Sequence, residues 1–252
     1  MTTSVALLLA GLFLPLFPLS MPFNMLYVRL RSSLTRALLL LAWPQIGLAI
    51  IGYYDVVAPG WMIAWGLATS LLYALRALAL RDVGLWTSFV ATSAWALLWI
   101  LHDNGATLPQ LQLYGLGISV PLLLMALLSA GLESRFGAAY LGLYGGLAQS
   151  IPRFAGVLVM VVLAIVATPL FPTFFAMLSM IVKALPASPF EAAGIAGVWL
   201  LWSWAGARLI QGLIIGPVRM TAPDLSQATV WLFVTVLSGL MIAGIYGSEL
   251  TI

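Results

Sequence analysis

The sequence predicts an all-α membrane protein, a polytopic bundle of about nine transmembrane helices with one broken helix near residues 168–172. Two counts support this class, because 63% of the 252 residues are hydrophobic and only 7% are charged. The mean hydropathy of +1.12 agrees with them. A soluble domain carries about 25% charged residues, since its surface faces water. Residues 1–252 are therefore expected to form a single transmembrane domain.

The composition also excludes several classes of function. The net charge of +3 comes from basic residues spread singly between apolar runs, which is typical of topology determinants and not of nucleic-acid binding. The absence of Cys excludes thiolate metal sites, iron–sulfur clusters and thiol nucleophiles, and a single His leaves no imidazole cluster. An intramembrane enzyme would need an Asp pair, a Ser–His pair or a metal motif within the spans. We therefore expect no enzyme, no catalytic residue, no metal site and no cofactor.

Nine apolar windows are bounded by charged residues or by Pro and Gly turns, and a spanning helix needs about 20 apolar residues. The windows are 4–27, 37–54, 60–80, 83–101, 111–132, 154–168, 170–186, 190–215 and 226–248. The first contains Pro15 and Pro18 and follows no basic segment, so we interpret it as a retained helix and not as a cleaved signal. The Gly-rich segment 136–152 is predicted to be a cytoplasmic interfacial loop or a short surface helix.

The sixth and seventh windows are short and leave two structures open. Thr168-Pro169 separates them and Pro172 follows, so they form either two thin helices or one long broken helix. The choice changes the side on which every later segment lies.

The basic residues predict the topology, because Lys and Arg are strongly disfavoured on the translocated side of a membrane. With nine spans, one side receives Arg29, Arg31, Arg36, Arg76, Arg81, Arg135, Arg153 and Lys183. The other side receives Arg208 and Arg219, together with Asp55, His102, Asp103 and Asp224. Eight basic residues against two predict a multi-pass protein of the bacterial inner membrane. Its N-terminus is expected to be periplasmic and its C-terminus cytoplasmic.

Four ionisable residues in or near the spans are candidates for an ion pathway or a subunit interface, because hydrocarbon penalises charge by about 2.5 kcal/mol or more. Arg76 could pair with Asp82 or extend to the membrane surface. Arg208 has apolar residues on both sides, so it either extends to the far interface or serves an ion pathway or subunit contact. Lys183 could join a proton relay, but Pro186 close behind it favours a helix end at the lipid headgroups.

Tryptophans at span ends have the pattern of an interfacial aromatic belt. Examples are Trp43, Trp61, Trp86, Trp99 and Trp231. Trp199 and Trp202, with Gly206, share one helix face and are interpreted as a packing ridge.

Several strings resemble, in order and spacing, the antiporter-like membrane subunits. That family is shared by respiratory complex I, Mrp-type cation/proton antiporters, membrane-bound hydrogenases and DAB-type inorganic-carbon complexes. The strings are Leu72–Leu78 with Arg81-Asp82 and Ser88, Gly131–Arg135, Tyr144–Leu147 before Pro152-Arg153, Thr168-Pro169 with Phe174, and Arg208–Gln211 through Gly216-Pro217. The resemblance covers about residues 70–245 and implies a shortened member with part of the family core.

Two departures bear on function. The family places a lysine soon after the Asp of its first motif, where this sequence has Gly84, and a Lys or Glu at the broken helix, where this sequence has Met177. The resemblance therefore implies a non-pumping or partial subunit of a proton- or cation-motive complex. This subunit would pack in the lipid bilayer against other membrane subunits, foremost a full-length antiporter-like protein.

The identity of the assembly stays open. Energy-coupled inorganic-carbon uptake, with a soluble zinc-binding partner, and a respiratory or antiporter complex, with a soluble redox partner, are the candidates that the resemblance implies. The alternative function is a small self-sufficient ion transporter or channel. It would require a polar path, and the scarcity of intramembrane polar residues counts against it. Few are present beyond Ser70, Thr92, Ser93, Ser119, Ser129 and Gln211.

Overall fold

The computed structural model describes residues 2–186, 188–218 and 221–248. Six helical segments in this part of the chain are long and apolar enough to cross a membrane. They are α3 (Ser33–Tyr54), α4 (Gly60–Ala79), α5 (Val83–Ala96) continued by α6 (Leu98–Asp103), α7 (Leu108–Phe136), α11 (Pro189–Ile214) and α12 (Gln227–Ser248). The all-helical membrane bundle is confirmed, whereas the count of nine spans is not.

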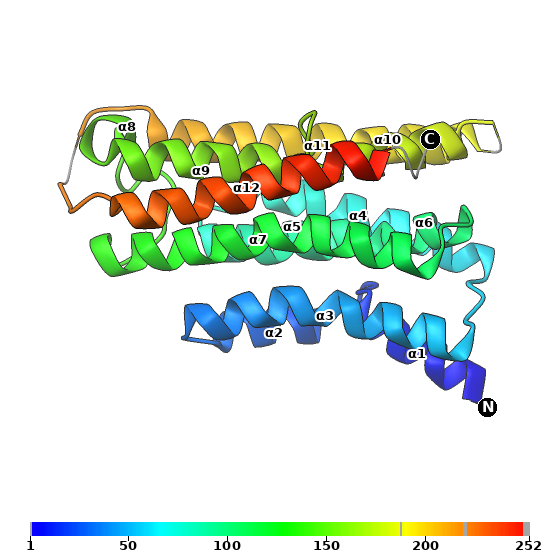
Figure 1. Cartoon of the computed structure of the whole chain (residues 1–252). Helices are drawn as coiled ribbons and strands as arrows, with labels where there is room; N and C mark the ends of the chain where they lie inside the picture. The colour runs from blue at the N-terminus through cyan, green and yellow to red at the C-terminus, as the bar shows by residue number, and fades with distance from the viewer. Residues whose placement is uncertain (1, 187, 219–220, 249–252) are drawn as a thin grey trace.

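Two further passes are discontinuous helices. Figure 1 shows α1 (Thr2–Phe13) followed end to end by α2 (Met21–Arg29), and α9 (Pro152–Ile165) followed end to end by α10 (Pro172–Ala184). The sixth and seventh windows therefore form one broken helix, as one of the two alternatives predicted. The window 4–27 is also interrupted, at residues 14–20. Pro15 and Pro18 lie in that interruption, and proline supplies no N–H for a helical hydrogen bond.

Local signals set several helix boundaries. Asp82 begins α5 by accepting a hydrogen bond of 2.7 Å from the N–H of Leu85. Thr107 and Gln110 form a reciprocal capping box at the start of α7, and Gly137 ends that helix with φ of 81°. The expected segment 136–152 contains a loop and then the short helix α8 (Leu147–Ser150).

The described passes alternate in direction, so α12 ends at the end of the bundle where α1 begins (Figure 1). The expected nine-span layout places the two termini on opposite sides. The difference arises because residues 152–184 cross once as a broken helix and not twice. Every segment after α10 is thereby reversed relative to the expectation.

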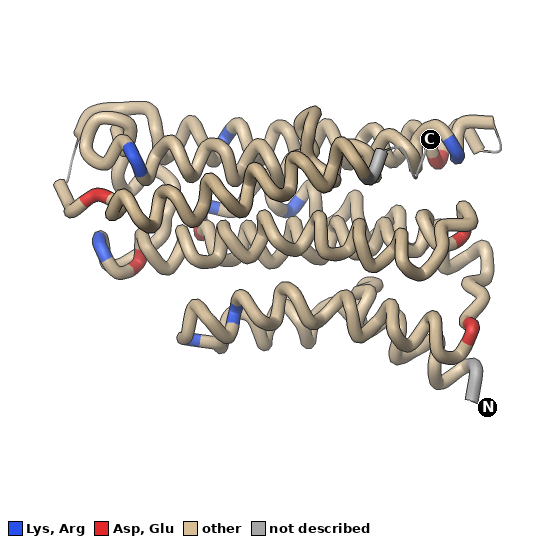
Figure 2. Tube along the Cα trace, viewed as in Figure 1, with Lys and Arg blue, Asp and Glu red and all other residues tan. Residues whose placement is uncertain are grey.

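Basic residues gather in one half of the bundle, toward one of its ends, as Figure 2 shows. We call this end the arginine end. There α2, α4, α7 and α11 finish and α3, α5, α9 and α12 begin. The eight arginines of the described chain lie in these helix ends or in the loops that join them. Lys183, in the last turn of α10, lies at the opposite end, and Arg219 lies outside the described residues.

Helix α5 forms the centre of the bundle. In the segment Val83–Asp103, 94% of an apolar 18-residue stretch is buried within the chain, whereas the corresponding share for Gln227–Tyr246 in α12 is only 17%. A helix that is apolar on all sides is favoured in such a central position. The polar side chains of α5 therefore face other helices and not lipid.

Candidate functional site

Buried hydroxyl and amide side chains link α5 to the first broken helix and to α4. Asn24 of α2 donates from Nδ2 to Thr92 Oγ1 at 3.1 Å and to the carbonyl oxygen of Ser20 at 3.0 Å. The Ser20 hydroxyl lies 2.7 Å from the Tyr73 hydroxyl of α4. Thr92 in turn donates to the Ser88 carbonyl at 2.9 Å. Buried polar groups are costly unless they are hydrogen-bonded. The side chains of Asn24, Thr92, Ser20 and Tyr73 meet this need through the contacts described.

A second buried group joins α4, α5 and α11. The hydroxyls of Ser70 and Ser93 lie 3.0 Å apart, and Ser93 Oγ also lies 2.8 Å from the Ser70 carbonyl oxygen. Trp202 Nε1 donates to Ser93 Oγ at 2.9 Å. All three side chains are almost completely buried. We call these contacts and those of Asn24, Ser20, Tyr73 and Thr92 the interior polar network.

Tryptophan N–H groups bind the carbonyls of the first helix interruption. Trp99 Nε1 donates to the Leu14 carbonyl at 3.0 Å, and Trp43 Nε1 donates to the Leu12 carbonyl at 3.2 Å. A helix end leaves carbonyls without intrahelical partners, and no water serves them within a membrane. The indoles replace that water. Trp99 and Trp43 therefore have a structural role inside the bundle, and the interpretation of Trp99 as an interfacial belt residue is wrong, because its side chain is fully buried.

The second interruption is satisfied in the same way. Between α9 and α10, Thr173 Oγ1 donates to the Ala164 carbonyl at 2.8 Å, and Thr168 Oγ1 donates to the Leu163 carbonyl at 2.9 Å. Trp199 Nε1 of α11 donates to the Val166 carbonyl at 3.2 Å. Trp199 therefore donates a structural hydrogen bond in addition to its packing role. Both broken helices are held by fixed side-chain donors.

An ion pair joins α3 and α7 near the arginine end. Arg36 of α3 and Glu133 of α7 lie 3.3 Å apart, with side chains 14% and 39% exposed. Arg36 also lies over the ring of the buried Tyr27, 5.6 Å from its centroid. Gly84 leaves room beside the pair, since a Cβ there would stand 3.8 Å from Arg36 Nη1 and 3.2 Å from Asp82 Oδ1. The sequence does not indicate this pair, because its two members lie 97 residues apart.

The four predicted site residues are not brought together. Of the two alternatives for Arg76, the ion pair with Asp82 is not formed, because the only ion pair of the described residues is the Arg36–Glu133 pair. Arg76 instead lies over the Phe89 ring at 5.0 Å, and Asp82 caps α5. Arg208 lies at the arginine end and not at the far interface, and its Nη1 donates to the Leu78 carbonyl at the end of α4. The exposed Lys183 is at the other end of the bundle.

Acidic, basic and histidine side chains lie near the ends of the described helices. Every described Asp, Glu, Lys, Arg and His lies in a loop or within six residues of a helix end, and Arg208, six residues before Ile214, is the furthest inside. Met177, where the family resemblance implies a Lys or Glu, is 2% exposed beside Thr173 and Trp202. Within the described chain, no group of three or more His, Asp or Glu residues could hold a metal ion.

Two solved membrane complexes contain chains with a similar fold. A chain of the respiratory complex I from Thermus thermophilus with bound NADH has a TM-score of 0.82 and 23% identity, with 95% of this chain and 53% of that chain covered. A chain of the Mrp complex from Dietzia sp. DQ12-45-1b has a TM-score of 0.76 and 18% identity, with 99% and 57% covered. No family model and no curated protein matches the sequence.

The chain therefore has the fold of a helical membrane chain of each of these two complexes, and the predicted resemblance is confirmed at the level of the fold. The chain spans about half the length of the two solved chains.

Proposed function

We propose that this chain is a membrane-embedded, non-pumping or partial subunit of a proton- or cation-motive complex. The observation that carries the proposal is a fold of the antiporter-like subunit type whose interior polar network contains only hydroxyl, amide, phenol and indole groups. A proton relay works through groups that titrate near the working pH, and hydrocarbon confines such groups to functional positions. The described bundle holds its Asp, Glu, Lys, Arg and His at the two ends.

Membrane partners are the second part of the proposal. Both solved chains with this fold come from complexes, namely a respiratory complex I and an Mrp complex. We propose that this chain packs against a full-length antiporter-like protein, with Arg76, Asp82 and Arg208 as polar contributors at the arginine end. Candidate assemblies are a respiratory or antiporter complex, with a soluble redox subunit, and an inorganic-carbon uptake complex, with a soluble zinc-binding subunit.

The charge distribution supports an orientation in the bacterial inner membrane. Cytoplasmic ends of membrane proteins are enriched in Lys and Arg. All eight described arginines lie at the arginine end, against Lys183 alone at the other. We therefore propose that the arginine end is cytoplasmic. The start of α1 and the end of α12 then face the periplasm, and cysteine labelling at residues 55 and 142 would read out the two sides.

Copurification tests the subunit assignment directly. The full chain, tagged and extracted in mild detergent from its native membrane, is expected to retain a longer antiporter-like protein. Asp82→Asn and Arg208→Ala are expected to weaken assembly or coupled transport, with Asp103→Asn at the opposite end as a control. A chain that purifies alone from native membranes would contradict the proposal. Unchanged assembly and transport in both variants would remove the roles of Asp82 and Arg208.

The alternative function is a small self-sufficient ion transporter or channel. One observation favours it: the interior polar network links α2, α4, α5 and α11 by hydrogen bonds of 2.7–3.1 Å between buried side chains. Hydroxyl chains can carry protons when water completes them. Ion flux through the purified chain in liposomes would favour this alternative over the subunit.

A further inference from the structure

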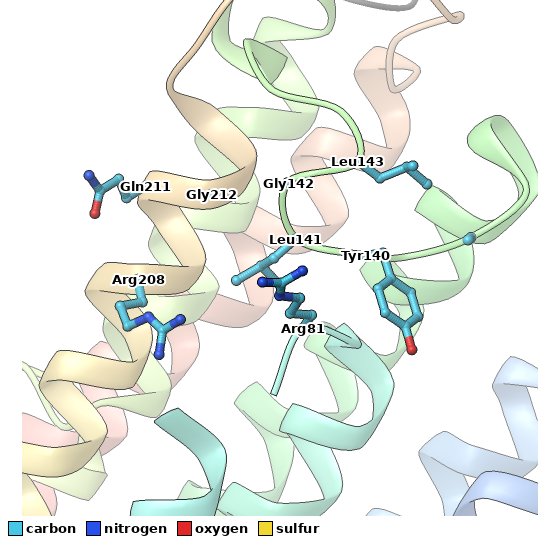
Figure 3. A pocket seen from close by; sticks show the side chains of 9 residues that line it. Arg81, Tyr140, Leu141, Gly142, Leu143, Arg208, Gln211 and Gly212 are labelled. Atoms are coloured by element: carbon cyan, nitrogen blue, oxygen red, sulfur yellow. The ribbon is translucent and has the colours of Figure 1, made fainter. Parts of the chain in front are cut away.

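A hollow of about 650 Å³ lies at the arginine end between α11 and the loop that follows α7. Figure 3 shows Arg81, from the connection between α4 and α5, and Arg208, from α11, projecting toward the same space. The loop side consists of Ala138 and residues 140–143, and the helix side includes Gln211 and Gly212. We call this space the arginine hollow.

The arginine hollow carries positive charge without a neutralising carboxylate. Its lining contains two arginines and no Asp or Glu. Arg81 is exposed and forms no ion pair with a described residue. Arg208 donates from Nη1 to the Leu78 carbonyl oxygen and forms no ion pair with a described residue, so the rest of its guanidinium group is available to a ligand. Two guanidinium groups around one space favour an anion, and the planar guanidinium binds phosphate oxygens in pairs.

The walls of the hollow are fixed by backbone contacts. The N–H of Leu141 donates to the Arg81 carbonyl at 2.8 Å, and the N–H of Gly142 donates to the Gly212 carbonyl at 3.4 Å. Gly212 allows the loop to approach α11, because a Cβ there would stand 3.3 Å from the Leu141 side chain. The loop wall is therefore attached both to the connection that carries Arg81 and to the helix that carries Arg208.

An apolar stripe leads from the hollow into the membrane. Leu200 and Trp204 precede Arg208 at intervals of four residues, so the three side chains share one face of α11. Leu200 is 68% exposed and Trp204 is 60% exposed. Leu143, 52% exposed, adds an apolar group at the rim. A ligand suited to this surface has a negative head at the arginines and an apolar tail along α11.

We propose that the arginine hollow binds the phosphate headgroup of an anionic phospholipid whose acyl chain lies along Leu200 and Trp204. Basic pockets at the cytoplasmic ends of membrane helices bind anionic lipid headgroups by this combination of charge and apolar surface. A free phosphate ion would use the arginines but not the stripe. The lipid accounts for both.

Native mass spectrometry of the purified full chain, titrated with phosphatidylglycerol or phosphatidylcholine, tests the proposal. Wild type is expected to retain phosphatidylglycerol at least tenfold more tightly than phosphatidylcholine. Arg81→Gln with Arg208→Gln is expected to abolish this preference. Arg81→Gln alone, which removes no hydrogen bond within the described chain, is expected to reduce it. Arg29→Gln with Arg31→Gln is the matched control, with the same charge change at the same end, and is expected to retain the preference.

Three outcomes would overturn the proposal. An equal loss in the Arg29/Arg31 control would show general attraction to anionic membranes. Displacement of the lipid by millimolar inorganic phosphate, with no effect of Leu200→Ser and Trp204→Ser, would indicate a free-anion site. A hollow filled by another subunit in the isolated complex, with no lipid retained, would overturn the lipid site and leave Arg208 only the subunit contact of the proposed function.

Discussion

Trp99 Nε1 donates a 3.0 Å hydrogen bond to the carbonyl oxygen of Leu14, a residue 85 positions earlier in the chain. The contact joins the central α5–α6 segment to the interruption between α1 and α2. It shows how this bundle keeps broken helices in an apolar medium, because a side-chain N–H replaces the missing backbone donor. Trp43 and Trp199 repeat the solution at other carbonyls of the two interruptions.

Trp99→Phe is therefore expected to destabilise the bundle. The phenyl ring fills most of the space of the indole but leaves the Leu14 carbonyl without its donor, at a cost of about 1–3 kcal/mol. Thermal unfolding in detergent, followed by circular dichroism, measures the change. Trp231→Phe is the control, because Trp231 is 60% exposed on α12. Equal stability of the two variants would contradict the role of the Trp99 contact.

Gly117 of α7 permits close packing on the α9–α10 interruption. A Cβ at this position would stand 2.7 Å from the Cβ of Pro172, the first residue of α10. Gly117→Ala is expected to lower the free energy of unfolding by about 1–3 kcal/mol through overpacking. Gly156→Ala is the matched control, because a Cβ there meets nothing within 4 Å and alanine favours a helix. Equal unfolding temperatures for both variants would exclude the close contact.

The Arg36–Glu133 pair is expected to show energetic coupling. A double-mutant cycle with Arg36→Met and Glu133→Gln should give a coupling energy of about 0.5–3 kcal/mol, because each single change leaves a half-buried charge without its partner. Chemical denaturation in detergent provides the four values. Arg36→Met combined with Asp103→Asn serves as the reference cycle across opposite ends of the bundle. A coupling of zero for the first cycle would show that the pair contributes nothing.

The contacts of Asp224 predict that the loop before α12 is attached to the start of α9 in a pH-dependent way. Burial acts to raise the pKa of its carboxyl group. The backbone N–H groups of Arg153, Phe154 and Leu225 donate to that group at 2.7–3.0 Å, and together with the Arg153 charge they hold its pKa below the usual range. A lowered folded-state pKa stabilises the fold above the unfolded pKa of about 3.9, and this contribution is lost as the pH falls through the folded value.

Asp224→Asn should therefore speed amide hydrogen exchange at Phe154 and Leu225 at neutral pH. The difference from wild type should shrink as the pH falls below about 4. Exchange rates are compared after correction for intrinsic pH dependence. Asp55→Asn, at the far end of α3, is the control. A difference that persisted unchanged at acid pH would contradict the assignment to the Asp224 carboxylate.

Much of the fold follows from local sequence, but the site depends on tertiary contacts. Apolar windows located the helices, and Thr168-Pro169 marked the second interruption. Pro15 and Pro18 marked the first as well, yet a 24-residue apolar window still favoured a single helix. Two separate passes at residues 154–186 would place Arg208 at the end opposite to the observed one, so the nine-span topology does not hold.

The interior contacts are harder to predict from the sequence than the helices are. Trp99 lies near a span end, where tryptophans at the lipid interface are also common. Only the packed bundle shows that its indole N–H donates to a buried carbonyl instead. Asn24 was detectable as an amide inside an apolar window, although its partner Thr92 lies 68 residues away. Arg36 and Glu133 are 97 residues apart, and each has the pattern of an ordinary helix-end charge.

Proton flux through the chain alone tests the central claim most directly. The purified full chain is reconstituted in liposomes with an imposed pH gradient and a trapped pH-sensitive dye, with empty liposomes as the reference. Because the interior polar network of the described bundle holds no Asp, Glu, Lys, Arg or His, we expect flux equal to the lipid background. Flux well above that background, abolished by Asn24→Leu or Ser93→Ala in a folded chain, would contradict a non-pumping subunit.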